Sequence, residues 1–342
     1  MPKNKWIRYI IAAACILLIF TVYDSISYKN ALSKPFDASD KNKIMFIIKN
    51  GETPKEVAQN LYNKKIISSA KYFYRYVKSY NKGSKIIAGG FLLSPSMTIP
   101  EIADEITNPS KNQYVLTVPE GYTVKDIDKK LTEMGLIKAG QFENAVKGFN
   151  EYEKYDFLDA EKLKNLSYPL EGYLFPDTYF IQPENFNPRD LIKKMLNNFD
   201  SKLNPAMRQE IARQNHTIHD IITMASLLEK EGRTEEEFKM IAGILWKRLE
   251  NNWFLDVDAA LLYETGKNTI SKEDLKINSP YNLRRSKKLP PGPISNPGLK
   301  AITAAIYSKK SPYWFYLTTP SGQTIYSKTN DEHIAAKLEY LK

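Results

Sequence analysis

A carboxylate on an apolar helix stripe is the first feature of this sequence that could do chemistry. From Thr217 to Gly232 the spacing of apolar residues predicts a helix. At about 100° per residue, one arc of this helix holds its apolar residues: Ile218, Ile221, Ile222, Ala225 and Leu228. Glu229 falls inside the arc, whereas Lys230 and Glu231 point away. Partial desolvation raises the pKa of such a carboxyl toward the range that a general acid needs at neutral pH. Periodicity leaves a second interpretation open, in which Glu229 lies in the last turn and faces solvent or a structural cation.

The histidines, the cysteine and the nucleotide-binding motifs offer no competing site. His216 and His219 are spaced i, i+3, but no HExxH zinc motif occurs, and we interpret them and His333 as helix-start and surface residues. No GxSxG elbow, P-loop or GxGxxG fingerprint is present, so hydrolase-fold esterases, NTPases and dinucleotide enzymes lack support. Because the only cysteine, Cys15, lies in an N-terminal apolar segment, the rest of the chain forms neither disulfides nor Cys-ligated zinc sites. We expect no metal and no cofactor.

Helix caps and hydrophobic periodicity predict the elements that must position Glu229. Two strands, at 313–317 and 323–327, flank a Pro-Ser-Gly turn near the C-terminus. The segment 168–181 is aromatic and punctuated by proline, and 289–298 is a Pro/Gly-rich tract. Helices are expected at several places: 145–157, 160–166, 188–202, 206–214, 217–230, 234–251, 299–307 and from Thr329 onward.

A strand–turn–helix pattern occurs three times upstream of this region. In the first copy an apolar run and an Asn-Gly turn precede Thr53, which makes a capping box with Glu56. The copy at 116–138 repeats its glycine, threonine and acidic positions, and a weaker copy at 91–106 is capped by a threonine. Capped strand–helix units also arise without a shared function. We nevertheless predict a small α+β module at 44–110, whose pattern resembles one half of a LysM-type carbohydrate-binding module.

The N-terminus predicts a membrane anchor. From Trp6 to Tyr23 the only charge is Arg8, so these 18 residues can span a bilayer as a helix. The basic residues precede the apolar run, so the positive-inside rule keeps residues 1–8 in the cytoplasm and exports the remainder. A cleaved signal peptide is the alternative, but the run exceeds a usual signal-peptide core. We expect an anchor at 1–23, a polar linker at 24–43 and an extracytoplasmic C-terminal part in a single-pass protein of the cell membrane.

Length and composition set the broad class. With 342 residues, 42% hydrophobic and 26% charged, the chain has several folding units and is globular outside the anchor. Its net charge of +10 fits nucleic acid, an anionic membrane or an anionic cell-wall polymer as partner. Export across a membrane argues against nucleic acid.

Four motifs resemble those of the membrane-anchored endolytic murein transglycosylase family (MltG or YceG-like). In chain order they are LEGYLFPDTY at 170–179, ASLLEKE at 225–231, SPYN at 279–282 and LPPGPISNPG at 289–298. The resemblance extends over essentially the whole chain, including the anchor and the LysM-like module. It implies an α+β fold in which residues 111–342, with the third strand–turn–helix unit at their start, form a mixed α+β catalytic region.

The resemblance implies cleavage of the β-1,4 bond between N-acetylmuramic acid and N-acetylglucosamine inside nascent peptidoglycan strands. The product is a 1,6-anhydromuramoyl end, and the reaction terminates or trims strand elongation. Glu229 matches the family's catalytic glutamate. One carboxyl suffices, because it protonates the leaving oxygen and then accepts the proton of the sugar's own C6 hydroxyl, whereas ordinary glycosidases need a second carboxylate. The resemblance also implies peptidoglycan synthases, the penicillin-binding proteins, as partners.

Five further residues receive roles from the resemblance alone. Glu171 and Tyr173 are expected to line the cleft, and Asp258, Tyr281 and Asn282 to hold sugar hydroxyl or acetamido groups. A structural interpretation stands beside each role, since Asp258 can cap the segment that follows it and Tyr281-Asn282 can form a turn.

The sequence departs from the family pattern between Phe254 and Ala260. The family has Gln or Glu at position 256 and often Pro-Thr at 259–260, whereas this chain has Asp256 and two alanines. This difference leaves the role of Asp256 open. The role of Glu231 is open as well, because Glu231 lies outside the apolar arc of its helix.

Two other functions compete with the transglycosylase. A hydrolytic muramidase would use Glu229 as acid and Asp258 or Glu171 as second carboxylate, and would leave reducing ends. A non-catalytic wall-binding scaffold would use the LysM-like module and the positive charge, and would keep its function in Glu229→Gln.

Overall fold

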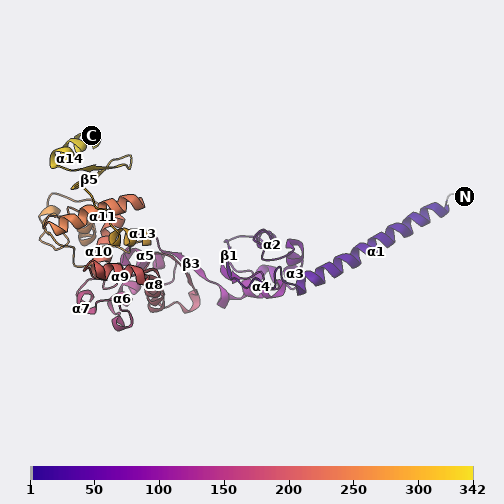
Figure 1. The fold of residues 1–342 in the computed structure, drawn as a ribbon. Coiled ribbons are helices and arrows are strands. Elements are labelled where there is room, and N and C mark those ends of the chain that lie inside the picture. The colour runs from indigo at the N-terminus through magenta and orange to yellow at the C-terminus, as the bar shows by residue number, and fades with distance from the viewer. Residues whose placement is uncertain (1–2, 342) are drawn as a thin grey trace. The chain divides into compact units, whose positions relative to one another are not determined.

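The computed structural model describes residues 3–341 and divides into two compact units, whose elements Figure 1 labels. Unit 1 comprises Met1–Val115 and Phe180–Asn185, and unit 2 comprises Leu116–Tyr179 and Phe186–Lys342.

Unit 1 begins with the helix α1 (Lys3–Ser33), which contains the apolar segment. Its residues Tyr9–Ser33, in which an 18-residue window has a mean hydropathy of 2.1, are long and apolar enough to cross a membrane. The helix continues past Tyr23 into the predicted linker, where Asp24 forms ion pairs with Lys71 at 2.5 Å and Arg75 at 2.8 Å. The predicted linker is therefore helical as far as Ser33, and only its remainder lies outside α1. The ion pairs of Asp24 join this part of α1 to α3.

The rest of unit 1 is built on one antiparallel strand pair. β1 (Ile44–Ile48) pairs with β2 (Gly89–Leu93), and Phe46 lies opposite Phe91. Both rings belong to a buried apolar core that the helices of the unit complete. The helices α2 (Pro54–Asn63) and α3 (Ala70–Ser79) lie between the strands in sequence, and α4 (Ile99–Thr107) follows β2.

Three threonine capping boxes confirm the predicted strand–turn–helix pattern. Thr53, Thr98 and Thr123 each accept a hydrogen bond from the backbone N–H three residues on, and the acidic residue at that position binds back. The first two boxes open α2 and α4, and the third opens α5 in unit 2. α3 is absent from our sequence prediction.

Unit 2 is mostly helical. β5 (Phe315–Thr318) pairs antiparallel with β6 (Thr324–Ser327), and β3 (Tyr114–Thr117) pairs with β4 (Thr178–Ile181), each of which has residues in both units. The helices are α5 (Val124–Glu133), α6 (Gln141–Lys147), α7 (Ala160–Leu163), α8 (Pro188–Lys202), α9 (Pro205–Arg213), α10 (Ile218–Glu231), α11 (Glu235–Glu250), α12 (Asp258–Thr265), α13 (Leu299–Ile306) and α14 (Asn330–Tyr340). Short 3-10 helices lie at Gly83–Lys85, Pro109–Lys111, Tyr152–Lys154, Pro183–Asn185 and Asp274–Lys276.

Most predicted helices of this region are confirmed, and the first is wrong. The predicted helix over 145–157 is instead the end of α6, a break at Gly148 and a 3-10 turn at Tyr152–Lys154. Gly148, the C-cap residue, ends α6, although the helical spacing of apolar residues continues beyond it.

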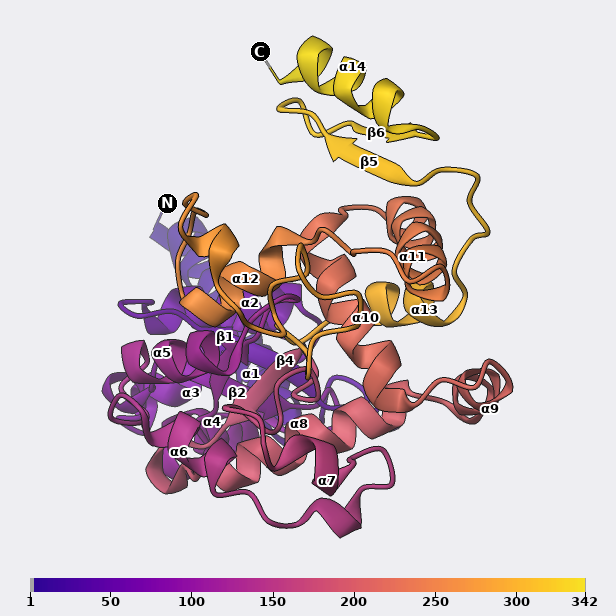
Figure 2. The same cartoon turned by 90° about the vertical axis from the view of Figure 1, so that its left-hand side faces the viewer.

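α10 is the central helix of unit 2 and packs against α11 and α13 (Figure 2). Every residue from Ile221 to Leu228 is at most 1% exposed, whichever face it occupies. A helix that is buried all round is a core helix, so the one-sided stripe that we predict is wrong. What distinguishes Glu229 is its position where α10 emerges from this core.

Candidate active site

Glu229 is held at the start of another helix. Its Oε2 accepts a hydrogen bond of 2.9 Å from the backbone N–H of Gly298, which is the N-cap residue of α13. The side chain is half-buried. Burial raises its pKa, the N–H of Gly298 opposes this rise, and the carboxylate of Glu120 adds to it. A half-buried carboxyl with a raised pKa suits a general acid.

The turn at Glu120-Gly121 lies directly against Glu229. Lys230 Nζ donates a 2.7 Å hydrogen bond to the carbonyl of Gly121. A β-carbon at Gly121 would lie 3.4 Å from Glu229 Cγ and 3.5 Å from Lys230 Nζ. A β-carbon at Gly298 would collide with the carboxylate of Glu120. The Glu120 carboxylate therefore occupies the place of a side chain at Gly298, beside the residue that binds Glu229, and our sequence analysis missed Glu120.

Asn296 ties three distant loops together and is fully buried. Its Oδ1 accepts hydrogen bonds from the N–H groups of Gly172 at 2.9 Å and Leu174 at 3.0 Å. Its Nδ2 donates to the carbonyl of Tyr122 at 2.9 Å and to Glu171 at 3.0 Å. The backbone of Asn296 also exchanges two hydrogen bonds of 2.8 Å with Gly121 and Tyr122. The Pro/Gly-rich tract thus fixes the turn that lies against Glu229.

Glu171 lies inside this network. It is 1% exposed, and both of its oxygens lie 3.1 Å from the backbone N–H of Val124, the first residue of α5. The hydroxyl of Tyr263 donates to it at 3.3 Å. Burial nevertheless raises the pKa of Glu171 to about 8, so the carboxyl is mainly protonated at pH 7. Glu171, expected in the cleft, has no surface that a substrate can touch in this structure.

Tyr173 belongs to a second buried chain of hydrogen bonds. Its hydroxyl lies 3.0 Å from Nδ1 of His219, whose Nε2 lies 2.8 Å from the carbonyl of Pro291. Because a carbonyl only accepts, Nε2 of His219 carries the proton and Nδ1 accepts from Tyr173. Tyr173 is 0% exposed and His219 6%. The surface position that we predict for His219 is wrong, and the ring positions the Pro/Gly-rich tract.

Ser226 anchors the same tract to α10 three residues before Glu229. Its hydroxyl accepts a 3.0 Å hydrogen bond from the N–H of Ile294 and donates at 2.7 Å to the carbonyl of Thr223. Its own carbonyl accepts from Ser295 at 3.4 Å. The helix that carries Glu229 and the tract that carries Gly298 are therefore bonded at three places along α10, namely His219, Ser226 and Glu229.

Asp258, Tyr281 and Asn282 lie elsewhere in unit 2. Asp258, the first residue of α12, forms a bidentate ion pair with Arg284 at 2.7 and 2.9 Å and does not act as the N-cap. Asn282 is fully buried, and its Nδ2 donates to the carbonyls of Leu275 and Ile277 at 3.0 and 2.9 Å. These bonds engage the amide of Asn282 in a turn.

Tyr281 lies beside Tyr263, with ring centroids 5.8 Å apart. Burial raises the pKa of Tyr281 to about 12. Of the three residues expected to hold sugar groups, Tyr281 alone is thus connected to the network, through the contact of Tyr263 with Glu171.

Glu231 ends α10 but faces away from Glu229. Its carboxylate accepts a 3.0 Å hydrogen bond from the hydroxyl of Tyr316 on β5. Burial raises the pKa of Glu231 to about 7. The nearby Arg248 donates to the carbonyls of Trp314 and Leu255. Glu231 therefore joins α10 to the C-terminal hairpin and not to the site around Glu229.

The arrangement suits acid–base chemistry by one carboxyl. Among residues 3–341, no group of three or more His, Cys, Asp or Glu side chains is arranged to hold a metal ion. Glu229 has a raised pKa, a rigid backbone donor and a neighbouring carboxylate at the point where α10 emerges from the core.

Comparisons with known proteins agree over most of the chain. Residues 46–339 match the YceG-like family. The endolytic murein transglycosylase of Bacillus subtilis (strain 168) is 30% identical over 332 residues, which cover 92% of this chain and 89% of that protein. The protein of the same name from Streptococcus pneumoniae serotype 2 (strain D39) is 29% identical, with 95% of this chain and 64% of that protein covered. A 2.6 Å crystal structure of a putative yceG-like protein from Listeria monocytogenes has a TM-score of 0.63 and 31% identity, and the match covers 86% of this chain and 99% of that one.

Proposed function

This chain belongs to the YceG-like family, and we infer from this membership that it is a lytic transglycosylase, a lyase that cleaves peptidoglycan strands internally. The match extends over nine-tenths of a protein named endolytic murein transglycosylase. Such enzymes are catalytic, so the scaffold alternative loses its support.

Glu229 is the proposed catalytic acid and base. The observation that carries this assignment is its hydrogen bond to Gly298 combined with its raised pKa. The protonated carboxyl donates its proton to the glycosidic oxygen as the bond from that oxygen to C1 of N-acetylmuramic acid breaks. The C6 hydroxyl of the same sugar then attacks C1, and its proton returns to the Glu229 carboxylate. The 1,6-anhydro end forms without water, and the enzyme regains its starting protonation state.

The hydrolytic alternative needs a second carboxylate that activates water. Glu171 is buried and mainly protonated at pH 7, and Asp258 is engaged by Arg284. The carboxylate that does lie beside Glu229 is Glu120. Its presence keeps hydrolysis as the second candidate, which the product decides.

Mass spectrometry of uncrosslinked glycan strands incubated with the detergent-solubilised chain tests both candidates. The transglycosylase yields 1,6-anhydro ends, whereas a hydrolase yields reducing ends that incorporate oxygen from labelled water. Glu229→Gln should lower the rate by about 10² to 10⁴-fold. The exposed Glu236→Gln on α11 is the matched control. Full activity of Glu229→Gln would overturn the assignment of this residue.

The LysM-like assignment of 44–110 belongs to the same proposal. The order β1-α2-α3-β2, with the two strands antiparallel, supports a carbohydrate-binding module of this kind. We also propose that α1 anchors the chain with its N-terminus in the cytoplasm, and that peptidoglycan synthases are its partners. The single apolar helix supports the anchor.

A further inference from the structure

A basic pocket opens next to the residue that follows Glu229. It has a volume of about 620 Å³ and lies within unit 2. Its walls come from the start of α5, the end of α6, the end of α12 and the Pro/Gly-rich tract. Four lysines line it: Lys125, Lys147, Lys230 and Lys267. A cavity of this size accommodates several amino-acid residues or a sugar unit.

The charge of the pocket is positive overall. Its two acidic lining residues are Asp126 and Glu264. Asp126 is engaged by the N–H and hydroxyl of Thr123 at 2.9 and 2.7 Å. Of the lysines, Lys267 pairs with Asp274 at 2.7 Å, and Lys147 pairs more loosely with Glu143 at 3.9 Å. The pocket therefore offers ammonium groups to an anionic ligand.

Two of the lysines gather around one aromatic ring. Lys125 Nζ lies 5.7 Å and Lys147 Nζ 4.9 Å from the centroid of the Tyr168 ring. Both lysines are exposed, so neither is needed for the core. The Tyr168 hydroxyl donates to Glu143 at 2.5 Å, and the ring holds both ammonium groups on the same wall of the pocket by cation–π contacts.

The pocket adjoins the proposed catalytic centre through Lys230, the residue that follows Glu229. Lys230 lines it, and the same Nζ binds the carbonyl of Gly121, whose Cα carries no side chain between Lys230 and Glu229. Ile294 lines it as well, and its N–H is bonded to Ser226 on the catalytic helix. A group attached to the sugar at Glu229 is thus within reach of the lysines.

The chemistry of the substrate supplies such a group. Each N-acetylmuramic acid carries a lactyl ether at C3, and a short peptide bearing free carboxylates extends from it. We propose that the basic pocket binds the carboxylates of the peptide stem on the N-acetylmuramic acid at the scissile bond. This inference rests on the proposed transglycosylase function, and it makes stem-bearing strands the preferred substrate.

Binding measured without cleavage tests the pocket directly. The full chain carrying Glu229→Gln is titrated in detergent with three labelled strands: one with intact stems, one stripped of stems by an amidase, and one whose stem carboxylates have been amidated. Intact strands should bind about tenfold more tightly than either of the others. Because exposed charges are screened, the preference should shrink as ionic strength rises.

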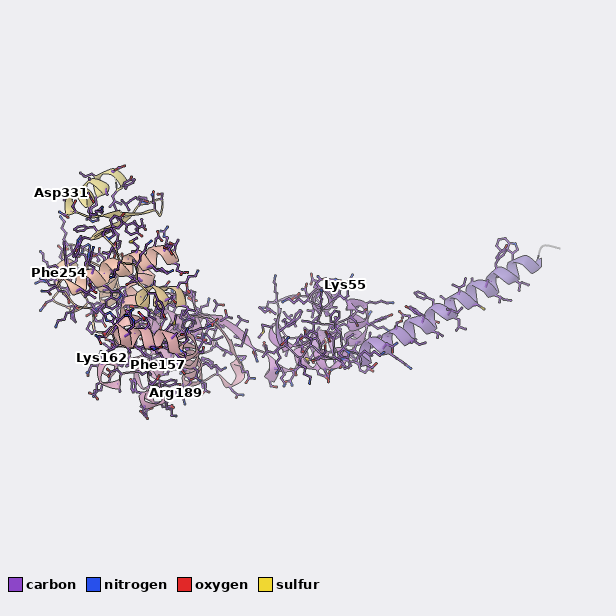
Figure 3. All side chains as sticks on the ribbon, viewed as in Figure 1. Lys55, Phe157, Lys162, Arg189, Phe254 and Asp331 are labelled. Carbon is purple, nitrogen blue, oxygen red and sulfur yellow. The ribbon has the colours of Figure 1, made fainter. Side chains whose placement is uncertain are left out.

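Lysine variants locate the effect. Lys125→Gln and Lys147→Gln are introduced together into the chain that carries Glu229→Gln. The preference for intact stems should fall to about twofold or less, since each exposed charge contact changes the affinity by about twofold to fivefold. Lys162→Gln is the matched control, because this exposed lysine on α7, labelled in Figure 3, belongs to a separate basic groove beside His219. The control should keep the full preference.

Several outcomes overturn the pocket assignment. It falls if intact, stripped and amidated strands bind equally, or if the double lysine variant keeps the preference while its melting temperature matches that of the parent. It also falls if Lys162→Gln removes the preference as well, because overall charge then explains the binding. A failure of the proposed function appears elsewhere, as a lack of anhydro ends from the chain with Glu229 intact, and leaves the binding result readable.

Discussion

Glu229 and Gly298 join two packed helices by one hydrogen bond, from the backbone N–H at the start of α13 to the carboxyl at the end of α10. A backbone donor has no side-chain rotamer to choose, so the carboxyl keeps one orientation toward the space beside Glu120. A β-carbon at 298 would collide with that second carboxylate in its present position. The bond therefore sets both the direction and the electrostatic surroundings of the proposed catalytic group.

The first prediction concerns the pH dependence of the reaction. Glu229 must be protonated to act as acid, so activity falls as pH rises through its raised pKa. The carboxylate of Glu120 contributes to that rise, and Glu120→Gln should therefore move the alkaline limb of the pH–rate profile to lower pH by up to about one unit. Glu133→Gln, an exposed change on α5, should leave the limb in place. An unchanged profile in Glu120→Gln would show that the two carboxyls do not interact.

The second prediction concerns stability and Glu171. Its pKa is about 8 in the folded chain against an ordinary 4.5, so the folded state binds the proton more tightly than the unfolded state does. The resulting stabilisation is complete below about pH 4.5 and is lost as pH rises through about 8. The free energy of unfolding should fall by at most about 1.4 kcal/mol per pH unit in that window.

Glu171→Gln imitates the protonated carboxyl and should remove this dependence. Thermal melting from pH 5 to 9 should show the variant overtaking the parent at alkaline pH. Glu171→Leu is the contrasting change, since it leaves the N–H of Val124 and the amide of Asn296 without their acceptor at a cost of about 1–3 kcal/mol each. Parallel melting curves for the parent and Glu171→Gln would contradict the raised pKa.

The third prediction concerns Asn296. Asn296→Ala removes four side-chain hydrogen bonds in a fully buried position and should destabilise the chain by about 3 kcal/mol. The melting temperature should fall by about 6–12 °C. Activity should fall further than stability explains, because the turn at Glu120-Gly121 loses its support. Asn150→Ala, in an exposed loop, should change neither the melting temperature nor the activity. If Asn296→Ala melts at the wild-type temperature, Asn296 does not hold the three loops together.

The fourth prediction concerns orientation in the membrane. In a Cys15→Ser background, Asp331→Cys places the only thiol at an exposed position, labelled in Figure 3, in the C-terminal helix. A membrane-impermeant maleimide should label it in intact cells, because we place everything after the anchor outside. Asn4→Cys in the same background should be labelled only after the cells are broken. The reverse pattern would invert the proposed topology.

Local signals in the sequence account for most of the secondary structure. A capping box involves residues three apart, so Thr53, Thr98 and Thr123 are recognisable without any knowledge of packing. α8 occupies the residues that the period predicts, 188–202. The prediction is wrong for α6, because a glycine ends that helix early. It also lacks α3, although Ser69 caps this helix and Phe73, Tyr76 and Val77 are buried at helical spacing.

The sequence by itself determined the family and the order of the elements, and it singled out Glu229 as the proposed catalytic residue, since each of these is written in contiguous motifs. It did not determine what surrounds that carboxyl. Asn296 binds residues 124 and 174 positions away, at Gly172 and Tyr122, and Glu120 reaches Glu229 across Gly298.

Only the tertiary structure decided that Glu171 and Tyr173 are buried supports and that Glu120 is a neighbour of Glu229. The physical reason is that burial and long-range hydrogen bonds depend on how packed helices bring distant loops together. A helical period records which face is apolar, and α10 is buried on every face from Ile221 to Leu228. Glu229 lies at the edge of that buried stretch, opposite the N–H of Gly298, which is the N-cap of α13. This arrangement therefore exists only in the folded chain.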